Sequence, residues 1–270
     1  MAHSIMKELV EVLVSPRDLI SCEPNTTLQT AISLMRAERI GALPVMDGGV
    51  PVGIFTERDY LTRIAGSSLN LNTSTIESFM VKDPATIASH RPIEEMVMVM
   101  HQRRFRHLLV RYESKASFSV ASIKDLLNYL PEDLPIFSAP TKTLLAGNPP
   151  VTCEEMCSLA DAVNQMRSHH IGSLLVTHHN GTLSGIFTER DVLFRVAPGV
   201  LDFRHEVVKT FMTPEPRGIT VSRPMRDALR ELRIGRFRHI VAYSDDRTLC
   251  GVISAKDILD HVAKNMGSLV

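Results

Sequence analysis

Four aspartates along the chain are each preceded, three positions earlier, by a threonine or a serine. These Thr/Ser-x-x-Asp segments, called tetrads below, are Thr56/Asp59, Ser122/Asp125, Thr188/Asp191 and Ser254/Asp257, and successive aspartates are 66 residues apart. A hydroxyl at a helix start and an acid three residues later form a capping box, which satisfies free backbone N–H groups. The same groups can hold a nucleotide, since a helix N-terminus attracts phosphate and a carboxylate accepts both hydroxyls of a ribose. One tetrad alone would indicate a cap, whereas four in phase favour a binding role that coexists with capping.

A cation stands immediately before each of these aspartates. The four cations are Arg58, Lys124, Arg190 and Lys256. The residue before the cation is a glutamate in the first and third tetrads and apolar in the other two: Glu57, Glu189, Ile123 and Ala255. We interpret the cations either as ligand contacts or as part of a solvated helix face, with equal weight.

The sequence Arg-Phe-Arg-His occurs at 104–107 and 236–239, upstream of the second and fourth tetrads only. An arginine at the C-terminus of a helix complements the helix dipole by about 0.3–1 kcal/mol, which accounts for Arg104 and Arg236. The dipole accounts less well for the residues that enter the next strand. These residues are Arg106, His107, Arg238 and His239.

A repeated set of elements must position these groups. An apolar stripe at i, i+3, i+4 and i+7 precedes every tetrad and predicts one buried helix face. The stripes are Leu28-Ala31-Ile32-Met35, Ile93-Met96-Val97-Met100, Leu159-Ala162-Val163-Met166 and Met225-Ala228-Leu229-Leu232. Around the first stripe we expect a short strand at 19–22, a hairpin of strands at 42–45 and 52–55, and a second helix at 56–63. The predicted fold class is α/β, with four β-α-β-β-α repeats.

The chain is a duplication of a duplication. The segment Gly-Ile-Phe-Thr-Glu-Arg-Asp at 53–59 returns at 185–191, which is 132 positions later. The repeats are expected at 8–66, 74–132, 136–199 and 205–264, with linkers at 66–74, 131–150 and 199–205. We expect the repeats to pair as 8–132 and 136–264, with the helices of the Leu28 and Ile93 stripes packed together. Residues 5–14 are expected to form a helix that caps the first repeat.

Composition limits the class of protein. The chain of 270 residues has 30 basic and 30 acidic residues, 44% hydrophobic residues and no tryptophan. These values exclude a disordered chain and argue against a nucleic-acid binder, which normally carries a basic face. No apolar stretch reaches the ~20 residues that span a bilayer, and no secretory signal is seen, so no membrane partner is expected. Four cysteines without a CxxC pair indicate reduced thiols and a cytoplasmic protein.

Catalytic and metal-binding motifs are not found in the sequence. There is no P-loop, no metal-ligand spacing and no nucleophile–base constellation, and no segment outside the four repeats is long enough for a catalytic domain. We therefore expect no metal and no enzyme activity.

The repeats resemble the CBS domain, the module named after cystathionine β-synthase, in four tandem copies from about Glu8 to Lys264. The resemblance rests on the striped helix and on the segments GALPV, GIFTERD and FM, which occur in the family's order and spacing. It implies modules that work in pairs, as in the gamma subunit of AMP-activated protein kinase, where two pairs pack into a disc. It also implies that adenosine-containing ligands bind in clefts between paired repeats.

The resemblance assigns roles to the residues above. Each tetrad aspartate matches a ribose contact and each tetrad hydroxyl a phosphate contact, and the two Arg-His pairs match basic residues that reach phosphates. Cys22 and Cys153 hold equivalent first-strand positions, where they either line an adenine cleft or serve as half-buried apolar residues. Ser119 and Ala121 depart from the family pattern, which makes the second repeat the weakest candidate site.

The sequence therefore predicts a non-catalytic regulatory module that senses an adenosyl ligand and signals to a partner protein. AMP, ADP and ATP are the first candidate ligands, with S-adenosylmethionine and NAD next. The identity of the effector protein is left open, as is a homodimer. The alternative is a structural or assembly module whose clefts are vestigial and whose tetrads only cap helices. A nucleotide-processing enzyme is disfavoured because no general base is placed near a scissile bond.

Overall fold

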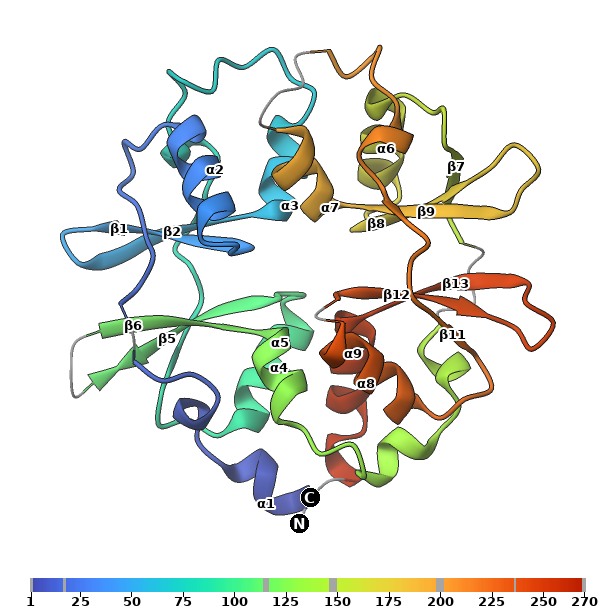
Figure 1. Ribbon diagram of the computed structural model, residues 1–270. Coiled ribbons are helices and arrows are strands. Elements are labelled where there is room, and N and C mark those ends of the chain that lie inside the picture. The colour runs from blue at the N-terminus through green and yellow to red at the C-terminus, as the bar shows by residue number, and fades with distance from the viewer. Residues whose placement is uncertain are drawn as a thin grey trace. The chain divides into compact units, whose positions relative to one another are not determined.

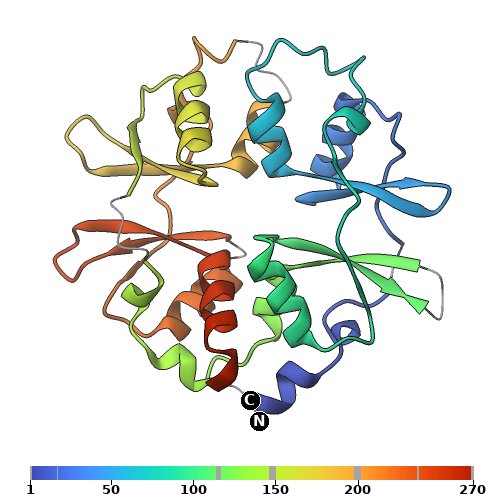
Figure 2. The same ribbon diagram turned by 180° about the vertical axis from the view of Figure 1, so that it is seen from behind.

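The computed structural model describes residues 2–16, 18–113, 117–145, 150–197, 202–235 and 237–268 (Figures 1 and 2). The chain divides into two compact units. One unit comprises Ile20–Pro84 and Val151–Pro216, and the other comprises Met1–Leu19, Ala85–Pro150 and Arg217–Val270. We call the first the odd unit, because it contains the first and third repeats, and the second the even unit, because it contains the second and fourth.

One ten-residue helix in each repeat carries the predicted apolar stripe. The helices are α2 (Leu28–Ala37), α4 (Ile93–Gln102), α6 (Leu159–Ser168) and α8 (Met225–Ile234). All sixteen stripe residues are buried, which confirms the helical periodicity read from the sequence. Thr27 caps α2 by accepting a hydrogen bond from the Thr30 amide at 3.2 Å. Pro92 and Pro224 occupy the N-cap positions of α4 and α8, so each helix begins one residue after its proline.

The odd unit contains two small sheets. In the first repeat the strand order is β1-β2-β3, and in the third it is β10-β9-β8-β7. Their bounds are β1 Ala42–Asp47, β2 Val50–Thr56, β3 Val81–Lys82, β7 Thr152–Glu154, β8 Ser173–Thr177, β9 Leu183–Thr188 and β10 Thr213–Pro214. The predicted strand at 19–22 is reduced to a single bridge between Cys22 and Val45.

The even unit repeats this plan with one three-stranded sheet in each repeat, ordered β4-β5-β6 and β11-β12-β13. The bounds are β4 Thr86–Ala88, β5 His107–Tyr112, β6 Ser117–Ser122, β11 Gly218–Thr220, β12 His239–Tyr243 and β13 Leu249–Ser254. Each sheet joins an antiparallel hairpin to a parallel first strand. The predicted α/β repeat, with a mixed sheet and helices, is confirmed.

The helix after each hairpin differs between the units. In the even unit it is a regular helix, α5 (Ile123–Tyr129) or α9 (Ala255–Lys264). In the odd unit a single turn, α3 (Glu57–Asp59) or α7 (Glu189–Asp191), passes directly into a π-helical turn at Tyr60–Ile64 or Val192–Val196. Among the described residues no helix is long and apolar enough to cross a membrane.

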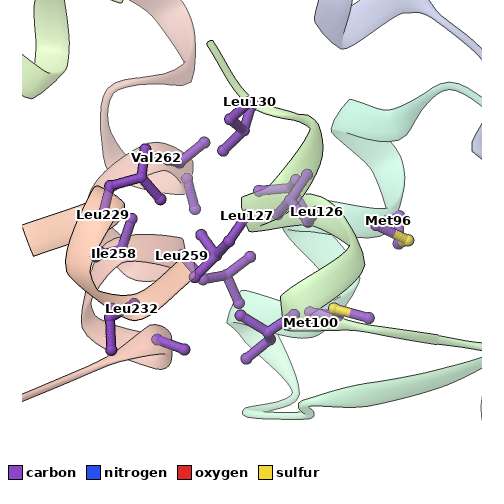
Figure 3. Packing of buried hydrophobic residues seen from close by; sticks show 14 of the residues in the cluster. Met96, Met100, Leu126, Leu127, Leu130, Leu229, Leu232, Ile258, Leu259 and Val262 are labelled. Atoms are coloured by element: carbon purple, nitrogen blue, oxygen red, sulfur yellow. The ribbon is translucent and has the colours of Figure 1, made fainter. Parts of the chain in front are cut away.

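The core of the even unit lies among α4, α5, α8 and α9. Figure 3 shows side chains from these four helices meeting in one cluster, which joins Met100 and Leu127 of the second repeat to Leu229 and Leu259 of the fourth. Burial of a leucine-sized side chain contributes roughly 1.5–3 kcal/mol, so this cluster holds the two even repeats together.

The expected packing of the Leu28 and Ile93 stripes is wrong. The Leu28 stripe shares a hydrophobic cluster with the Leu159 stripe, whereas the Ile93 stripe belongs to the cluster of the Met225 stripe. All four stripes are apolar and share the same helical period. The period therefore does not predict which two stripes pack against each other. The tetrad helices differ between the units, because the odd unit buries Glu57 and Glu189 at the positions where the even unit buries apolar side chains. A buried glutamate needs a counter-ion, and each of these two finds an arginine of the other odd repeat.

The N-terminal segment packs against the second repeat, and the prediction that it caps the first is wrong. Helix α1 (Ala2–Lys7) and a 3-10 turn at Val10–Val12 belong to the even unit, where Val10 is fully buried. The Val10 amide donates to the Arg91 carbonyl at 2.9 Å. The second predicted linker, at 131–150, also packs against a repeat of the even unit. Its Thr141 amide donates to the Arg223 carbonyl at 2.7 Å. Residues 146–149 of that linker lie outside the described residues, as do residues 199–201 of the third.

Candidate functional site

The two tetrads of the odd unit are complete capping boxes at the ends of β2 and β9, and α3 and α7, which they open, lie side by side in Figure 1. Asp59 Oδ2 accepts from the Thr56 amide at 2.9 Å and from Thr56 Oγ1 at 2.6 Å. Asp191 Oδ2 accepts the same two bonds from Thr188, at 2.9 and 2.7 Å. One carboxylate oxygen of each aspartate is thereby held by its own tetrad.

The tetrads of the even unit have the same geometry. Asp125 Oδ2 accepts from the Ser122 amide at 2.8 Å and from its hydroxyl at 2.6 Å. Asp257 Oδ2 accepts from the amide and hydroxyl of Ser254, each at 2.7 Å. The structure therefore places all four predicted hydroxyl–aspartate pairs at helix starts.

Burial makes these carboxyl groups sensitive to hydrogen-bond donors. Asp59 and Asp191 are each 7% exposed, and burial raises the pKa of both carboxyls against the opposing effect of the threonine hydrogen bonds. Burial likewise raises the pKa of Asp257. A buried carboxylate is costly unless donors surround it, so a hydroxyl-bearing ligand that reaches the second oxygen would be bound favourably.

The second carboxylate oxygen distinguishes odd repeats from even ones. Asp59 Oδ1 lies 4.0 Å from Nη2 of Arg63, and Asp191 Oδ1 lies 3.3 Å from Nε of Arg195. Within the described part of the chain, Oδ1 of Asp125 and of Asp257 has neither a hydrogen bond nor an ion pair. The even tetrads thus offer an open acceptor, while the odd ones offer an acceptor beside an arginine.

Arg58 and Arg190 join the two odd repeats to each other. Arg190 Nη1 donates to Glu57 Oε1 at 3.0 Å, and Arg58 Nε lies 3.9 Å from Glu189 Oε2. Arg58 also donates to the His170 carbonyl, and Arg190 to the Arg39 carbonyl, each at 3.1 Å. Both glutamates are only 1% exposed. The helix face at these positions is therefore a buried ionic contact between repeats rather than a fully solvated surface.

Lys256, the cation of the fourth tetrad, hydrogen-bonds Asp260 one turn further along α9. Asp260 also pairs with His101 Nδ1 at 2.8 Å, so this lysine belongs to a small charged group that links the two even repeats. Lys124 lies close enough to His107 to lower the pKa of its imidazole. Lys124 is thus part of the basic cluster described next.

The two Arg-His pairs lie directly beside the even tetrads. His107 faces Ser122 across β5 and β6, and His239 faces Ser254 across β12 and β13. Residues paired across antiparallel strands project on the same face, so each histidine neighbours a tetrad hydroxyl. The carbonyls of the preceding arginines accept from the first amide of the tetrad helix, Arg106 from Ile123 and Arg238 from Ala255. In the odd repeats Gly41 and Gly172 make the equivalent bonds.

The basic groups of the two even repeats gather around one imidazole. The pKa of His107 is held well below its usual value, first by burial and then by the positive charges of Arg238, Arg106 and Lys124. Arg238 comes from the fourth repeat and the other groups from the second. This arrangement concentrates positive charge next to a neutral histidine, which suits an anionic ligand. Arg236, the first residue of the second Arg-Phe-Arg-His segment, lies outside the described residues.

Cys22 and Cys153 both lie in the odd unit. Burial raises the pKa of Cys22 to about 11 and that of Cys153 to about 12, so both thiols stay protonated. Cys153 is 7% exposed and belongs to the hydrophobic cluster of the unit. This environment favours the apolar alternative for Cys153. Within the described residues no group of three or more His, Cys, Asp or Glu side chains could hold a metal ion.

Sequence reasoning did not identify Arg63 and Arg195 as site residues. They stand four positions after the tetrad aspartates, one helical turn away, which is the spacing of an i,i+4 ion pair. The recurrence of arginine at this position in the two odd repeats was the available signal, since the even repeats have Tyr129 and His261 there.

Comparison with known proteins gives the same repeat pattern. A family model described as CBS domain matches the chain four times, over residues 10–66, 76–132, 145–198 and 208–264. A CBS domain-containing protein of Arabidopsis thaliana is 25% identical over 283 residues, which cover 90% of this chain and 51% of that protein. The chain spans about half the length of this relative and of a second CBS domain-containing protein of Arabidopsis thaliana.

Solved structures share the architecture. A Methanocaldococcus jannaschii protein, proposed as an archaeal homologue of gamma-AMPK, superposes with a TM-score of 0.82 at 15% identity and covers 94% of this chain and 99% of its own. At this identity the likeness shows the fold. A CBS domain protein of Pyrobaculum aerophilum, solved as a complex with AMP, is 24% identical, covers 44% of this chain and 89% of its own, and has a TM-score of 0.41. The complex with AMP is a finding on that protein.

Proposed function

Given that the chain belongs to the CBS-domain family, we propose that it is a non-catalytic regulatory module that binds adenosine-containing nucleotides through its tetrads. Binding would be read by a partner protein. The observation that carries the proposal is the state of the even tetrads, in which one oxygen of Asp125 and of Asp257 lies in the cap, while the other has no hydrogen bond or ion pair with the described residues. A ribose diol supplies two hydroxyl donors to such a carboxylate.

The basic cluster of the even unit supports a phosphate-bearing ligand. Arg106 and His107 adjoin the second tetrad, and Arg238 and His239 adjoin the fourth. Arginine pairs with phosphate in a bidentate manner, and such charge-assisted bonds are roughly twice as strong as neutral ones. AMP, ADP and ATP therefore come first among the candidate ligands, with S-adenosylmethionine and NAD second.

The tetrads are suited to binding rather than to catalysis. Each aspartate accepts hydrogen bonds from a backbone amide and a hydroxyl, which fix its position and favour its ionised form. General acid–base catalysis would need a group that exchanges protons with a substrate within hydrogen-bond reach. A carboxylate held in a cap contributes recognition instead.

A panel of ligands measured by thermal shift tests the proposal. The intact chain would be heated with adenosine, AMP, ADP, ATP, S-adenosylmethionine and NAD at increasing concentrations. A ligand present at 100 times its Kd stabilises the folded protein by ~2.7 kcal/mol, which is a readily measured increase in melting temperature. The completeness of the capping boxes also fits the alternative, a structural module whose tetrads only cap helices. Melting temperatures that stay constant with every ligand would favour that alternative.

A further inference from the structure

The residue four positions after each tetrad aspartate binds a segment outside its own hairpin. Arg63 Nη1 donates to the Phe79 carbonyl at 2.7 Å and to the Met80 carbonyl at 3.4 Å. Arg195 Nη1 donates to the carbonyls of Phe211 and Met212, each at 2.9 Å. The even repeats make single bonds of the same kind, from Tyr129 to Glu8 and between His261 and the Ile136 carbonyl. This position therefore tethers the tetrad helix in all four repeats.

The odd repeats add an electrostatic link that is not seen among the described residues of the even repeats. The guanidinium that holds the carbonyls of Phe79 and Met80 also faces Asp59 Oδ1, and the guanidinium of Arg195 faces Asp191 Oδ1 at 3.3 Å. A guanidinium has five N–H donors in a rigid fork, so one arginine can serve a carboxylate and two carbonyls together. The tetrad carboxylate and the carbonyl segment thus share one cation.

That carbonyl segment is the start of a short strand laid against the tetrad strand. Met80 precedes β3, which pairs with β2 through Gly53 and Lys82. The Met80 sulfur lies so close to Gly53 that a Cβ there would be 2.2 Å from it, and Met212 is placed in the same way against Gly185, at 2.5 Å. A Cβ at Gly185 would also lie 2.8 Å from the backbone carbonyl oxygen of Thr213, so glycine at this position lets β10 approach β9 this closely. The chain leaves the odd unit two residues after β3, at Pro84.

We propose that Arg63 and Arg195 are positioning residues that couple the tetrad carboxylates to β3 and β10, so that a ligand held by Asp59 or Asp191 loosens the short strand that follows. The ligand-driven part rests on the proposed function. A ribose hydroxyl donating to Oδ1 competes with the arginine for the same oxygen. The arginine is then displaced from the oxygen that orients it, and its bonds to the carbonyls weaken.

Two backbone amides report on the two strands independently. The Asp83 amide donates to the Val52 carbonyl at 3.2 Å beside β3, and the Glu215 amide donates to the Ser184 carbonyl at 3.3 Å beside β10. Hydrogen exchange at these amides measures local opening of each strand. Because the two sites are equivalent, a substitution in one repeat leaves the other as an internal reference.

A double-mutant cycle on the ligand-free chain tests the coupling. Arg63→Met keeps the apolar stem and removes the donors, so exchange at Asp83 should become about five- to tenfold faster while Glu215 is unchanged. Asp59→Asn removes the charge and should accelerate exchange at Asp83 about twofold, the effect expected of a long i,i+4 ion pair whose arginine is about half exposed. Adding Asp59→Asn to Arg63→Met should then leave the exchange rate at Asp83 the same as in Arg63→Met alone. An equal effect of Asp59→Asn in both backgrounds would overturn the proposal.

Saturating AMP tests the ligand-driven part of the proposal. In the wild-type chain AMP should accelerate exchange at both Asp83 and Glu215, and in Arg63→Met it should act on Glu215 only, although AMP still raises the melting temperature. An AMP response at Asp83 that survives in Arg63→Met rules out the arginine as the coupling residue. If AMP neither raises the melting temperature nor alters exchange, the proposed function and the ligand-driven part fail together, and the ligand-free cycle still decides the coupling.

Discussion

Glu57 and Arg190 are 133 positions apart, yet Nη1 of the arginine donates to Oε1 of the glutamate at 3.0 Å. The glutamate is buried, whereas the arginine side chain is 35% exposed and also lies over the ring of Phe194, 4.2 Å from its centroid. Arg58 and Glu189 form the reciprocal contact. The two tetrad helices of the odd unit are therefore joined by the residues between their hydroxyl and their aspartate, where the even unit uses apolar contacts.

Arg190→Met is expected to destabilise the odd unit. Loss of one partner of a fully buried ion pair costs ~3–5 kcal/mol, and because Arg190 is partly exposed we expect about 2 kcal/mol in the free energy of unfolding. Urea unfolding would measure the loss. Arg91→Met, which removes the exposed pair with Glu95, is the matched control and should cost less than ~0.5 kcal/mol. Adding Glu57→Gln to Arg190→Met should recover part of the loss, and the explanation is wrong if it adds to it.

The stability of the chain should carry an acid-favoured contribution from Asp257. Burial raises the pKa of Asp257 above its ordinary value of 3.8, so in the window above 3.8 the folded state holds a proton that the unfolded state has released. The free energy of unfolding therefore falls as pH rises through that window. Asp257→Asn should flatten this part of the pH profile, as measured by urea unfolding from about pH 4 to 7.

Asp246 offers a control of opposite sign. The hydrogen bond from Ser244 and the Thr248 amide hold the pKa of this exposed carboxyl below its usual range. Its contribution therefore appears as pH rises and is lost at acid pH. Asp246→Asn should leave the acid-favoured slope in place. An unchanged slope in Asp257→Asn would show that this carboxyl is not the source.

The tetrad aspartates should contribute to nucleotide affinity. Asp59→Ala, Asp191→Ala, Asp125→Ala and Asp257→Ala each remove a charged acceptor, and a hydrogen bond to such a group is worth ~1.5–3 kcal/mol. Because Arg63 and Arg195 already face the odd aspartates, the losses should be larger in the two even variants. Titration calorimetry with AMP measures them. Variants that melt earlier and bind AMP as tightly as wild type would show that the tetrads act only as caps.

The local parts of this structure follow from local sequence. The stripes that begin at Leu28 and Ile93 have the helical period, and the tetrads have the spacing of a capping box, so both the buried helix faces and the helix starts could be predicted. The Arg-His pairs could be placed at a strand start because they follow a helix in both even repeats. Each of these predictions depends on residues within a few positions of one another.

Contacts between distant segments could not be predicted in this way. Nothing near Val10 indicates that its amide meets the Arg91 carbonyl, and nothing near Arg63 indicates the carbonyl of Phe79, because backbone acceptors look the same in every sequence. For the same reason the sequence could not show which repeats pack together. Glu57 finds Arg190 rather than Lys124 or Lys256 only because the odd repeats pack together, and the repeat spacing is identical for every pair.

The Arg-His pairs lead to a prediction about ligand charge. His107 and His239 face the serines of the even tetrads, and Arg106 and Arg238 accept hydrogen bonds from the first amides of the tetrad helices. The odd repeats place Gly41 and Gly172 at the arginine positions, so they bring no such charge. We expect Arg106→Ala and Arg238→Ala to weaken the binding of ATP and ADP more than that of AMP, and AMP more than adenosine.

Titration of the four ligands against wild type and the two variants measures this gradient. The affinity ratio between wild type and variant should increase with the number of phosphates and shrink as salt is raised, because part of the loss is Coulombic. Arg111→Ala, which removes an exposed arginine of the same strand β5, is the matched control and should give a ratio near unity for every ligand. If the arginines serve only the helix dipole, both variants lose a few tenths of a kcal/mol of stability and the ratio does not depend on phosphate number. A flat ratio across the series would remove Arg106 and Arg238 from the ligand site, whereas a graded one would place the phosphates beside the even tetrads.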